Sequence, residues 1–126
     1  MAPDNHAFGT HEFMLLCQLV GARPWLNVNL VIGTDQEMKD WMEYCNRPSG
    51  TDLAALREKN GSPAPFRAEY WGIGNEVWDG GGRFTPESYA DEYRKYSMAV
   101  PSFRKSPEDA NAPRMKLLLS GPDGNK

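Results

Sequence analysis

Three short apolar segments, separated from one another by helical patterns, constrain the fold of this chain most strongly. The segments span residues 25–32, 69–74 and 115–119. The first is apolar at most positions, and Asn27 and Asn29 are its polar interruptions. Such a run is typical of a strand that is covered on both faces, as in a parallel sheet. The order helix, strand, helix, helix, strand, helix, strand therefore predicts the α/β class, with parallel strands joined by right-handed crossovers.

Capping residues mark where the helices between these strands begin. Thr10, Thr34 and Thr85 are suitable N-cap residues, and Glu37 forms a capping box with Thr34. Pro86 follows Thr85 and suits the first helical position. Apolar residues at helical spacing then predict helices over residues 10–20, 35–45, 52–59 and 86–100.

The length and charge of the chain restrict its class. The 126 residues allow one domain, and 40% hydrophobic with 25% charged residues argue against disorder. The net charge of -3 supplies no basic surface, so we expect no nucleic-acid partner. No segment approaches the roughly 20 apolar residues of a membrane-spanning helix, so we expect no membrane partner. The N-terminal residues lack a signal-peptide pattern, which favours the cytoplasm but leaves the compartment unknown.

The two cysteines, Cys17 and Cys45, each lie on the apolar face of a predicted helix. Free cysteine is among the most buried residue types, so we predict that both are reduced, buried and unpaired. The predicted elements also begin with a helix and stop after a third strand, and three strands cannot close a barrel. We therefore expect both ends to be cut from a larger fold.

Chemistry is expected where the strands of a βα fold end and turn into loops. The richest such place follows the second strand, where Asn75 and Glu76 come directly after the apolar segment. Trp78 adds a flat apolar surface of the kind on which sugars stack, and Asp79 adds a second carboxylate. Glu76 is a candidate general acid, although the residues also fit a solvated glutamate beside a glycine turn. Asn29 belongs to the same edge by its position.

Metal and cofactor signals are weak. His6 and His11 have no third or fourth ligand at zinc spacing, so we expect no metal site. Gly72 and Gly74 lack the third glycine of a dinucleotide fingerprint, and no phosphate-binding lysine follows the glycine run 80–82. We therefore expect no cofactor.

The segment Tyr70 to Glu76, followed by Trp78 and the glycine run 80–82, resembles the acid/base segment of the α-L-arabinofuranosidases of glycoside hydrolase family 51. Further segments are similar to that family in the same order, and they span residues 8–13, 27–30, 41–46, 56–61, 85–90 and 120–122. The family has a TIM barrel with an added β-sandwich. The resemblance therefore implies a partial (β/α)8 TIM barrel, about strands 3 to 5, with residues 1–126 as a fragment of the catalytic domain.

The resemblance also implies roles for individual residues. Glu76 corresponds to the general acid/base, and Asn75 to the neighbour that hydrogen-bonds the 2-hydroxyl of the sugar. Asn29 and Trp78 are expected substrate contacts by position, and Asp79 receives no family role. The implied reaction is the retaining hydrolysis of terminal arabinofuranosyl residues from arabinan or arabinoxylan, without a cofactor.

The family's nucleophile is a glutamate at the end of the seventh strand, outside the matched segments. We therefore expect the isolated chain to be inactive, and to self-associate or to assemble with a complementary barrel half. Two alternatives stay open. One is another TIM-barrel glycosidase of the same clan, acting on β-linked sugars. The other is a non-catalytic module, either an inert gene fragment or a half-barrel that binds sugar or assembles with a partner.

Overall fold

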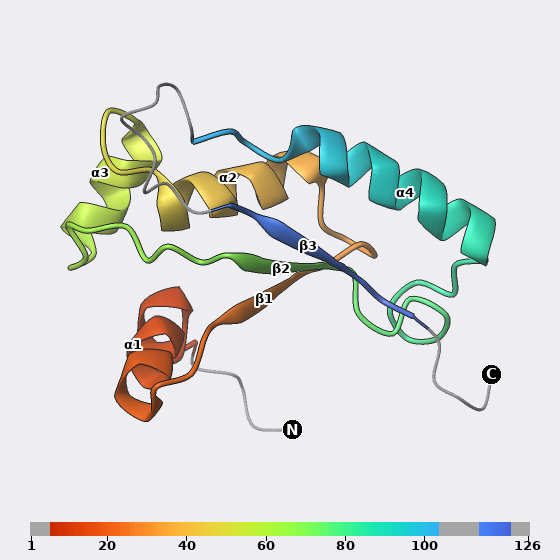
Figure 1. The fold of residues 1–126 in the computed structure, drawn as a ribbon, viewed down its shortest axis with the longest axis horizontal. Coiled ribbons are helices and arrows are strands. Elements are labelled where there is room, and N and C mark those ends of the chain that lie inside the picture. Colours follow the sequence, from red (N-terminus) through yellow and green to blue (C-terminus); the bar gives the residue numbers. More distant parts are fainter. Residues whose placement is uncertain (1–5, 104–113, 122–126) are drawn as a thin grey trace.

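The computed structural model describes residues 6–103 and 114–121. Three parallel strands form one sheet in the order β1-β2-β3, as predicted (Figure 1). Most of the loop expected after the last helix lies outside the described residues. The elements are α1 Thr10–Val20, β1 Trp25–Val28, α2 Asp35–Asn46, α3 Asp52–Lys59, β2 Tyr70–Ile73, α4 Pro86–Ala99 and β3 Lys116–Leu119.

β1 is shorter than the apolar run 25–32 predicted. It ends at Val28, because the Asn29 side chain closes a turn directly after it. The Oδ1 atom of Asn29 accepts hydrogen bonds from the amides of Val31 at 2.8 Å and Ile32 at 3.2 Å. This local bonding competes with the extended backbone that a longer strand requires.

Only one face of β1 is buried. Leu26 and Val28 are buried, whereas Trp25 and Asn27 are exposed. The expectation of a strand covered on both faces is therefore wrong for β1. Because side chains alternate along a strand, Asn27 lies on the face opposite the helices that bury Leu26 and Val28.

The predicted helix starts are confirmed at α2 and α4, and α1 begins differently. Thr34 and Glu37 form the capping box of α2, and the Thr85 side chain caps α4. The N-cap of α1 is Gly9 rather than Thr10, and its amide donates to the Glu12 carboxylate at 2.8 Å. A glycine has no side chain to cap the helix, so the carboxylate of the first turn satisfies the exposed amide.

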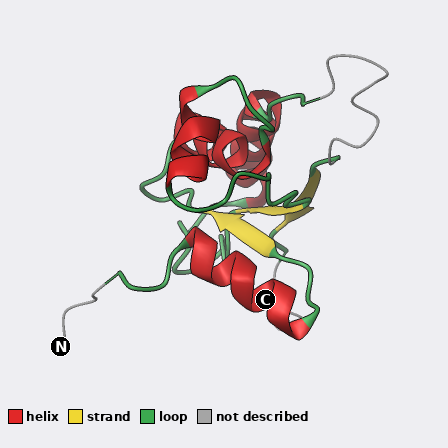
Figure 2. Ribbon diagram, turned by 90° about the vertical axis from the view of Figure 1, so that its left-hand side faces the viewer, coloured by secondary structure: helices red, strands yellow, loops and turns green. Residues whose placement is uncertain are grey.

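The helices α2, α3 and α4 gather on one side of the sheet, and α1 stands apart beside the start of β1 (Figures 1 and 2). Both cysteines are buried and free, which confirms the prediction. No helix in ranges 6–103 and 114–121 is long and apolar enough to span a membrane. The core between sheet and helices contains Leu26, Val28, Met38, Met42, Cys45, Ala68, Trp71, Ile73, Tyr96 and Phe103.

Candidate active site

A cavity of about 310 Å³ opens at the carboxyl ends of β1 and β2. Asn29, Asn75 and Glu76 line it together, as the sequence predicted from their positions after the strands. The strands run parallel toward the turn that follows β2 (Figure 1). Parallel strands bring their carboxyl ends to one edge of the sheet, which is why residues 46 positions apart in sequence, Asn29 and Asn75, share one cavity.

Glu76 adopts a backbone conformation that is uncommon for its residue type. Its φ is +44°, in the left-handed region that favours glycine. The Glu76 carbonyl accepts hydrogen bonds from the amides of Asp79 at 2.9 Å and Gly81 at 3.1 Å. These two bonds hold the residue in the strained conformation, of the kind that clusters at functional sites.

The turn after β2 folds back so that Gly81 lies against the backbone of Asn75. A Cβ atom placed on Gly81 would overlap the carbonyl group of Asn75, so this position requires the missing side chain. Val77 is buried and its carbonyl accepts from the Phe84 amide at 2.7 Å, which anchors the base of the turn. Asn75 and Glu76 stay exposed above that anchor. The turn therefore presents both side chains to solvent from a fixed backbone.

The loop after β1 brings the Asn29 backbone to the same cavity. The Tyr96 hydroxyl, from α4, donates to the Gly33 carbonyl at 2.9 Å and so ties this loop to the helix layer. Gly33 in turn packs against the Asn29 carbonyl closely enough that a Cβ atom would overlap it. The Asn29 Oδ1 atom is engaged by the loop amides, so its amide nitrogen is the side-chain group suited to meet a ligand.

Asn27 also lines the cavity and was not singled out from the sequence. The signal was present, because Asn27 and Asn29 lie two residues apart in the apolar run 25–32, which the sequence predicted to be one strand. Residues two apart on a strand share a face.

Trp78 and Asp79 lie on the same turn as Glu76 but outside the cavity. Trp78 is half-buried within the turn, and the lining of the cavity includes neither residue. Asp79 is exposed, and its amide is one of the two that bond the Glu76 carbonyl. Among the described residues, Glu76 is the single carboxylate that lines this cavity.

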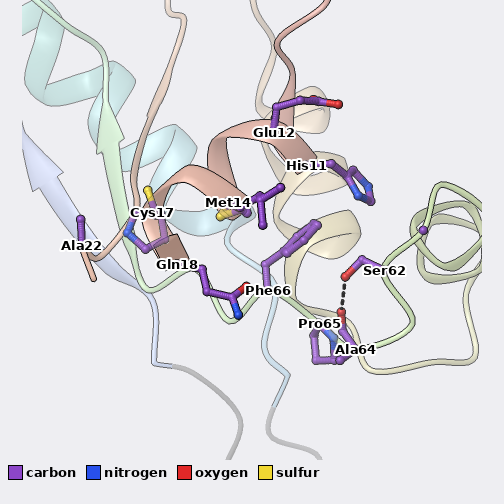
Figure 3. A pocket seen from close by; sticks show the side chains of 13 residues that line it. His11, Glu12, Met14, Cys17, Gln18, Ala22, Ser62, Ala64, Pro65 and Phe66 are labelled. Atoms are coloured by element: carbon purple, nitrogen blue, oxygen red, sulfur yellow. Dashed lines mark hydrogen bonds between the residues drawn. The ribbon is translucent and has the colours of Figure 1, made fainter. Parts of the chain in front are cut away.

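A second, larger cavity of about 630 Å³ lies between α1 and the segment 61–66 (Figure 3). It shares no lining residue with the cavity at Glu76. Its carboxylate, Glu12, is bonded by the Gly9 amide, which holds the pKa of that carboxyl below its usual value. A carboxyl that ionises so readily is a poor general acid, so this cavity is the weaker candidate.

Metal-ligating groups do not gather in the described ranges. No group of three or more histidine, cysteine, aspartate or glutamate side chains is placed there to hold an ion. His11 instead shares a hydrogen bond of 2.6 Å with the Tyr44 hydroxyl and meets Phe66 edge-on.

Comparisons with known proteins agree with the family resemblance seen in the sequence. The family described as "Alpha-L-arabinofuranosidase 1 domain" matches residues 2–123. The chain is 43% identical, over 94 residues, to an intracellular exo-alpha-L-arabinofuranosidase of Bacteroides ovatus; this covers 75% of the chain and 18% of the relative. It is 39% identical over 126 residues to a probable alpha-L-arabinofuranosidase C of Aspergillus fumigatus, covering 98% of the chain and 23% of the relative.

Solved structures give the same result. The alpha-L-arabinofuranosidase of Thermotoga maritima, solved as an arabinose complex, matches with a TM-score of 0.79 at 33% identity, over 96% of this chain and 24% of that one. The GH51 arabinofuranosidase of Xanthomonas axonopodis pv. citri matches with a TM-score of 0.78 at 34% identity, over 92% and 22%. The chain thus spans about a fifth of the length of such relatives, 18% to 23% of the two curated ones. It belongs to the α-L-arabinofuranosidases of glycoside hydrolase family 51.

Proposed function

We propose that the chain supplies the acid/base side of the active site of a retaining glycoside hydrolase. The substrate class is terminal arabinofuranosyl residues of arabinan or arabinoxylan. One observation carries the proposal: the Glu76 carboxylate, held on a left-handed turn at the end of β2, shares a cavity with Asn75 and Asn29. The family to which the chain belongs supports an arabinofuranosyl sugar as the substrate.

Each residue of the cavity has a proposed task. Glu76 protonates the oxygen of the departing group and then removes a proton from the attacking water. Asn75, its neighbour on the same turn, hydrogen-bonds the 2-hydroxyl of the sugar. Asn29, on the loop after β1, donates from its amide nitrogen. Trp78, half-buried within the same turn as Glu76, is proposed to stack its ring on the sugar.

A retaining mechanism needs a second carboxyl group, about 5–5.5 Å from the first, as the nucleophile. Glu76 is the carboxylate of the cavity within the described residues, so we assign the nucleophile to a further part of the barrel. Residues 1–126 are then a portion of a TIM-barrel catalytic domain, about strands 3 to 5.

Exposed apolar surface supports that placement in a larger barrel. One side of α1 exposes four large apolar side chains, which are Leu15, Leu16, Leu19 and Val20, and Leu19 is 74% exposed. In the described sheet, the outer edges of β1 and β3 have no neighbouring strand. Unpaired strands and contiguous apolar faces are surfaces that further elements cover.

The test joins this chain to a whole barrel. Residues of this chain replace the matching segment of the Thermotoga maritima enzyme, and hydrolysis of aryl arabinofuranosides is measured. Glu76→Gln is expected to lower kcat/KM, which reports the first chemical step, by about 10²–10⁴-fold on a substrate with a poor leaving group, and by less on an activated one. Glu58→Gln, on an exposed position of α3, is the matched control and is expected to leave turnover unchanged.

Two results would contradict the proposal. Turnover that is indifferent to Glu76→Gln on both substrates removes Glu76 from the reaction. Robust turnover by the 126-residue chain alone, abolished by Glu76→Gln, places the second carboxylate within the chain, with Asp79 as the first residue to test.

A further inference from the structure

The hydroxyl group of Tyr89 joins the ends of two strands. It donates to the Ile73 carbonyl at 2.6 Å and accepts from the Ser120 amide at 2.9 Å. Ile73 is the last residue of β2, and Ser120 directly follows β3. Tyr89 is 8% exposed and comes from α4, the helix that connects these strands. A single buried oxygen therefore bridges β2 and β3 at the edge where the candidate active site opens.

The hydroxyl stands where the sheet would otherwise continue. The Lys116 amide donates to the Glu69 carbonyl at 2.7 Å, and bonds of a parallel ladder repeat every two residues along each strand. By that repeat, the Ser120 amide would donate directly to the Ile73 carbonyl. Tyr89 takes both partners instead. The inserted oxygen ends the β2–β3 pairing and sets the separation of the strand ends.

Beyond this point β2 is held from its other side. The Gly74 amide donates to the Val28 carbonyl of β1 at 3.1 Å. Glu76 follows two residues after Gly74. The backbone that leads to Glu76 is thus fixed by β1 on one side and by the Tyr89 hydroxyl on the other.

We propose that Tyr89 is a positioning residue for Glu76, with its hydroxyl setting the place of the β2 end from which the acid/base carboxylate projects. This rests on the proposed function of Glu76. Tyr89 does not line the cavity and acts through the backbone. Burial raises the pKa of the Tyr89 phenol, so the proton donated to Ile73 is retained at neutral pH.

Hydrogen exchange of the 126-residue chain tests the bridge. Tyr89→Phe keeps the ring between the strand ends, so the Ser120 amide and the Ile73 carbonyl stay apart and lose their partner. We expect the peptide 114–121 to contain an amide that exchanges at least about tenfold faster, as read by mass spectrometry. The matched control is Tyr93→Phe, one helical turn later. Its ring packs against Tyr89 with centroids 6.3 Å apart. Equal exchange in both variants would overturn the bridge.

Kinetics in the Thermotoga maritima chimera test the positioning. Tyr89→Phe is expected to lower kcat/KM, which reports the first chemical step, by about tenfold or more on a poor leaving group while changing kcat/KM on an activated one much less. That selectivity is the signature of a displaced general acid, which a general loss of folded enzyme would not produce. An equal loss on both substrates overturns the positioning role. If the rate loss caused by Glu76→Gln is the same for both leaving groups, the proposed function fails. The hydrogen-exchange result still decides whether the Tyr89 bridge exists.

Discussion

The Asn46 side chain pairs with the backbone of Ala68 as a neighbouring strand would. Its amide nitrogen donates to the Ala68 carbonyl at 2.9 Å, and its Oδ1 atom accepts from the Ala68 amide at 2.7 Å. Asn46 is the last residue of α2, and Ala68 precedes β2. Both are buried. The end of a helix is therefore fixed to the start of the strand whose far end carries Glu76.

Asn46→Ala is expected to lower the free energy of unfolding by about 2–4 kcal/mol, because it leaves the buried Ala68 amide without a partner. Urea denaturation followed by circular dichroism measures the loss. Asn60→Ala is the control, since the exposed Asn60 amide bonds the Tyr44 hydroxyl at the surface. Its expected loss is below about 1 kcal/mol. Equal losses in the two variants would mean that the pairing with Ala68 carries no special weight.

Arg57 organises the loops on both sides of α3. Arg57 is 1% exposed, and its guanidinium donates to five backbone carbonyls, those of Tyr44, Arg47, Pro48, Ser62 and Pro63. Arg57→Lys keeps the charge but not the planar fork of donors. We expect a loss of about 3–5 kcal/mol in the free energy of unfolding, from a charge left without most of its hydrogen bonds.

Arg94→Lys is the matched substitution at an exposed site, where the arginine pairs with Asp91. It is expected to change the free energy of unfolding by less than about 1 kcal/mol. If Arg57→Lys unfolds at the same urea concentration as Arg94→Lys, the five carbonyl bonds contribute little net stability.

The parts of the fold predicted correctly depend on neighbours in sequence. Thr34 and Glu37 make their capping box within one turn, and Pro86 follows its N-cap residue directly. The position of Asn75 and Glu76 at the cavity is predictable because they immediately follow an apolar segment, and strand ends meet at one edge of a parallel sheet. The family resemblance added the chemical roles, which residue spacing alone left open.

The parts that were missed depend on contacts in space. The two hydrogen-bond partners of the Tyr89 hydroxyl are 16 and 31 positions away in sequence, so no local pattern predicts the bridge. The carbonyl partners of Arg57 lie 5 to 13 positions away, in the segments that precede and follow its helix, and no helical or strand periodicity connects them. The overlong first strand has a local cause: Asn29 bonds amides two and three residues ahead, and apolar composition does not reveal that competition.

Cys45 makes the stability of the chain sensitive to alkaline pH. Complete burial raises the pKa of its thiol to about 12, against the weaker opposing effect of the Arg57 charge. In the unfolded chain the thiol titrates near its ordinary value of about 8.5. Above about pH 9 the unfolded state therefore releases a proton that the native state keeps, so stability present at neutral pH is lost as the pH rises toward 12.

The expected slope for this one proton approaches about 1.4 kcal/mol per pH unit. Urea titrations of the wild type and of Cys45→Ala at pH 9 and 10 isolate the contribution of the Cys45 thiol to this slope, because the other titrating groups are common to both proteins. The stability difference between the two is expected to shrink over that interval and to stay constant between pH 6 and 7. A difference that stays constant up to pH 10 contradicts the raised pKa.

Substitutions at the adjacent glycines Gly80 and Gly81 distinguish two reasons for glycine in the turn after β2. One reason is close contact with Asn75, and the other is backbone flexibility alone. A Cβ atom on Gly81 would overlap the backbone of Asn75, which cannot move aside as a side chain can, whereas a Cβ atom on Gly80 meets nothing within 4 Å. Gly81→Ala is expected to cost about 1–3 kcal/mol in the free energy of unfolding, as overpacking does. In the chimera it is also expected to lower kcat/KM by about tenfold or more, because Asn75 and Glu76 must shift. Gly80→Ala is expected to keep both values near those of the parent. Paired urea titrations and hydrolysis rates measure the contrast, and a Gly81→Ala variant that behaves like Gly80→Ala would show that the turn does not close on Asn75.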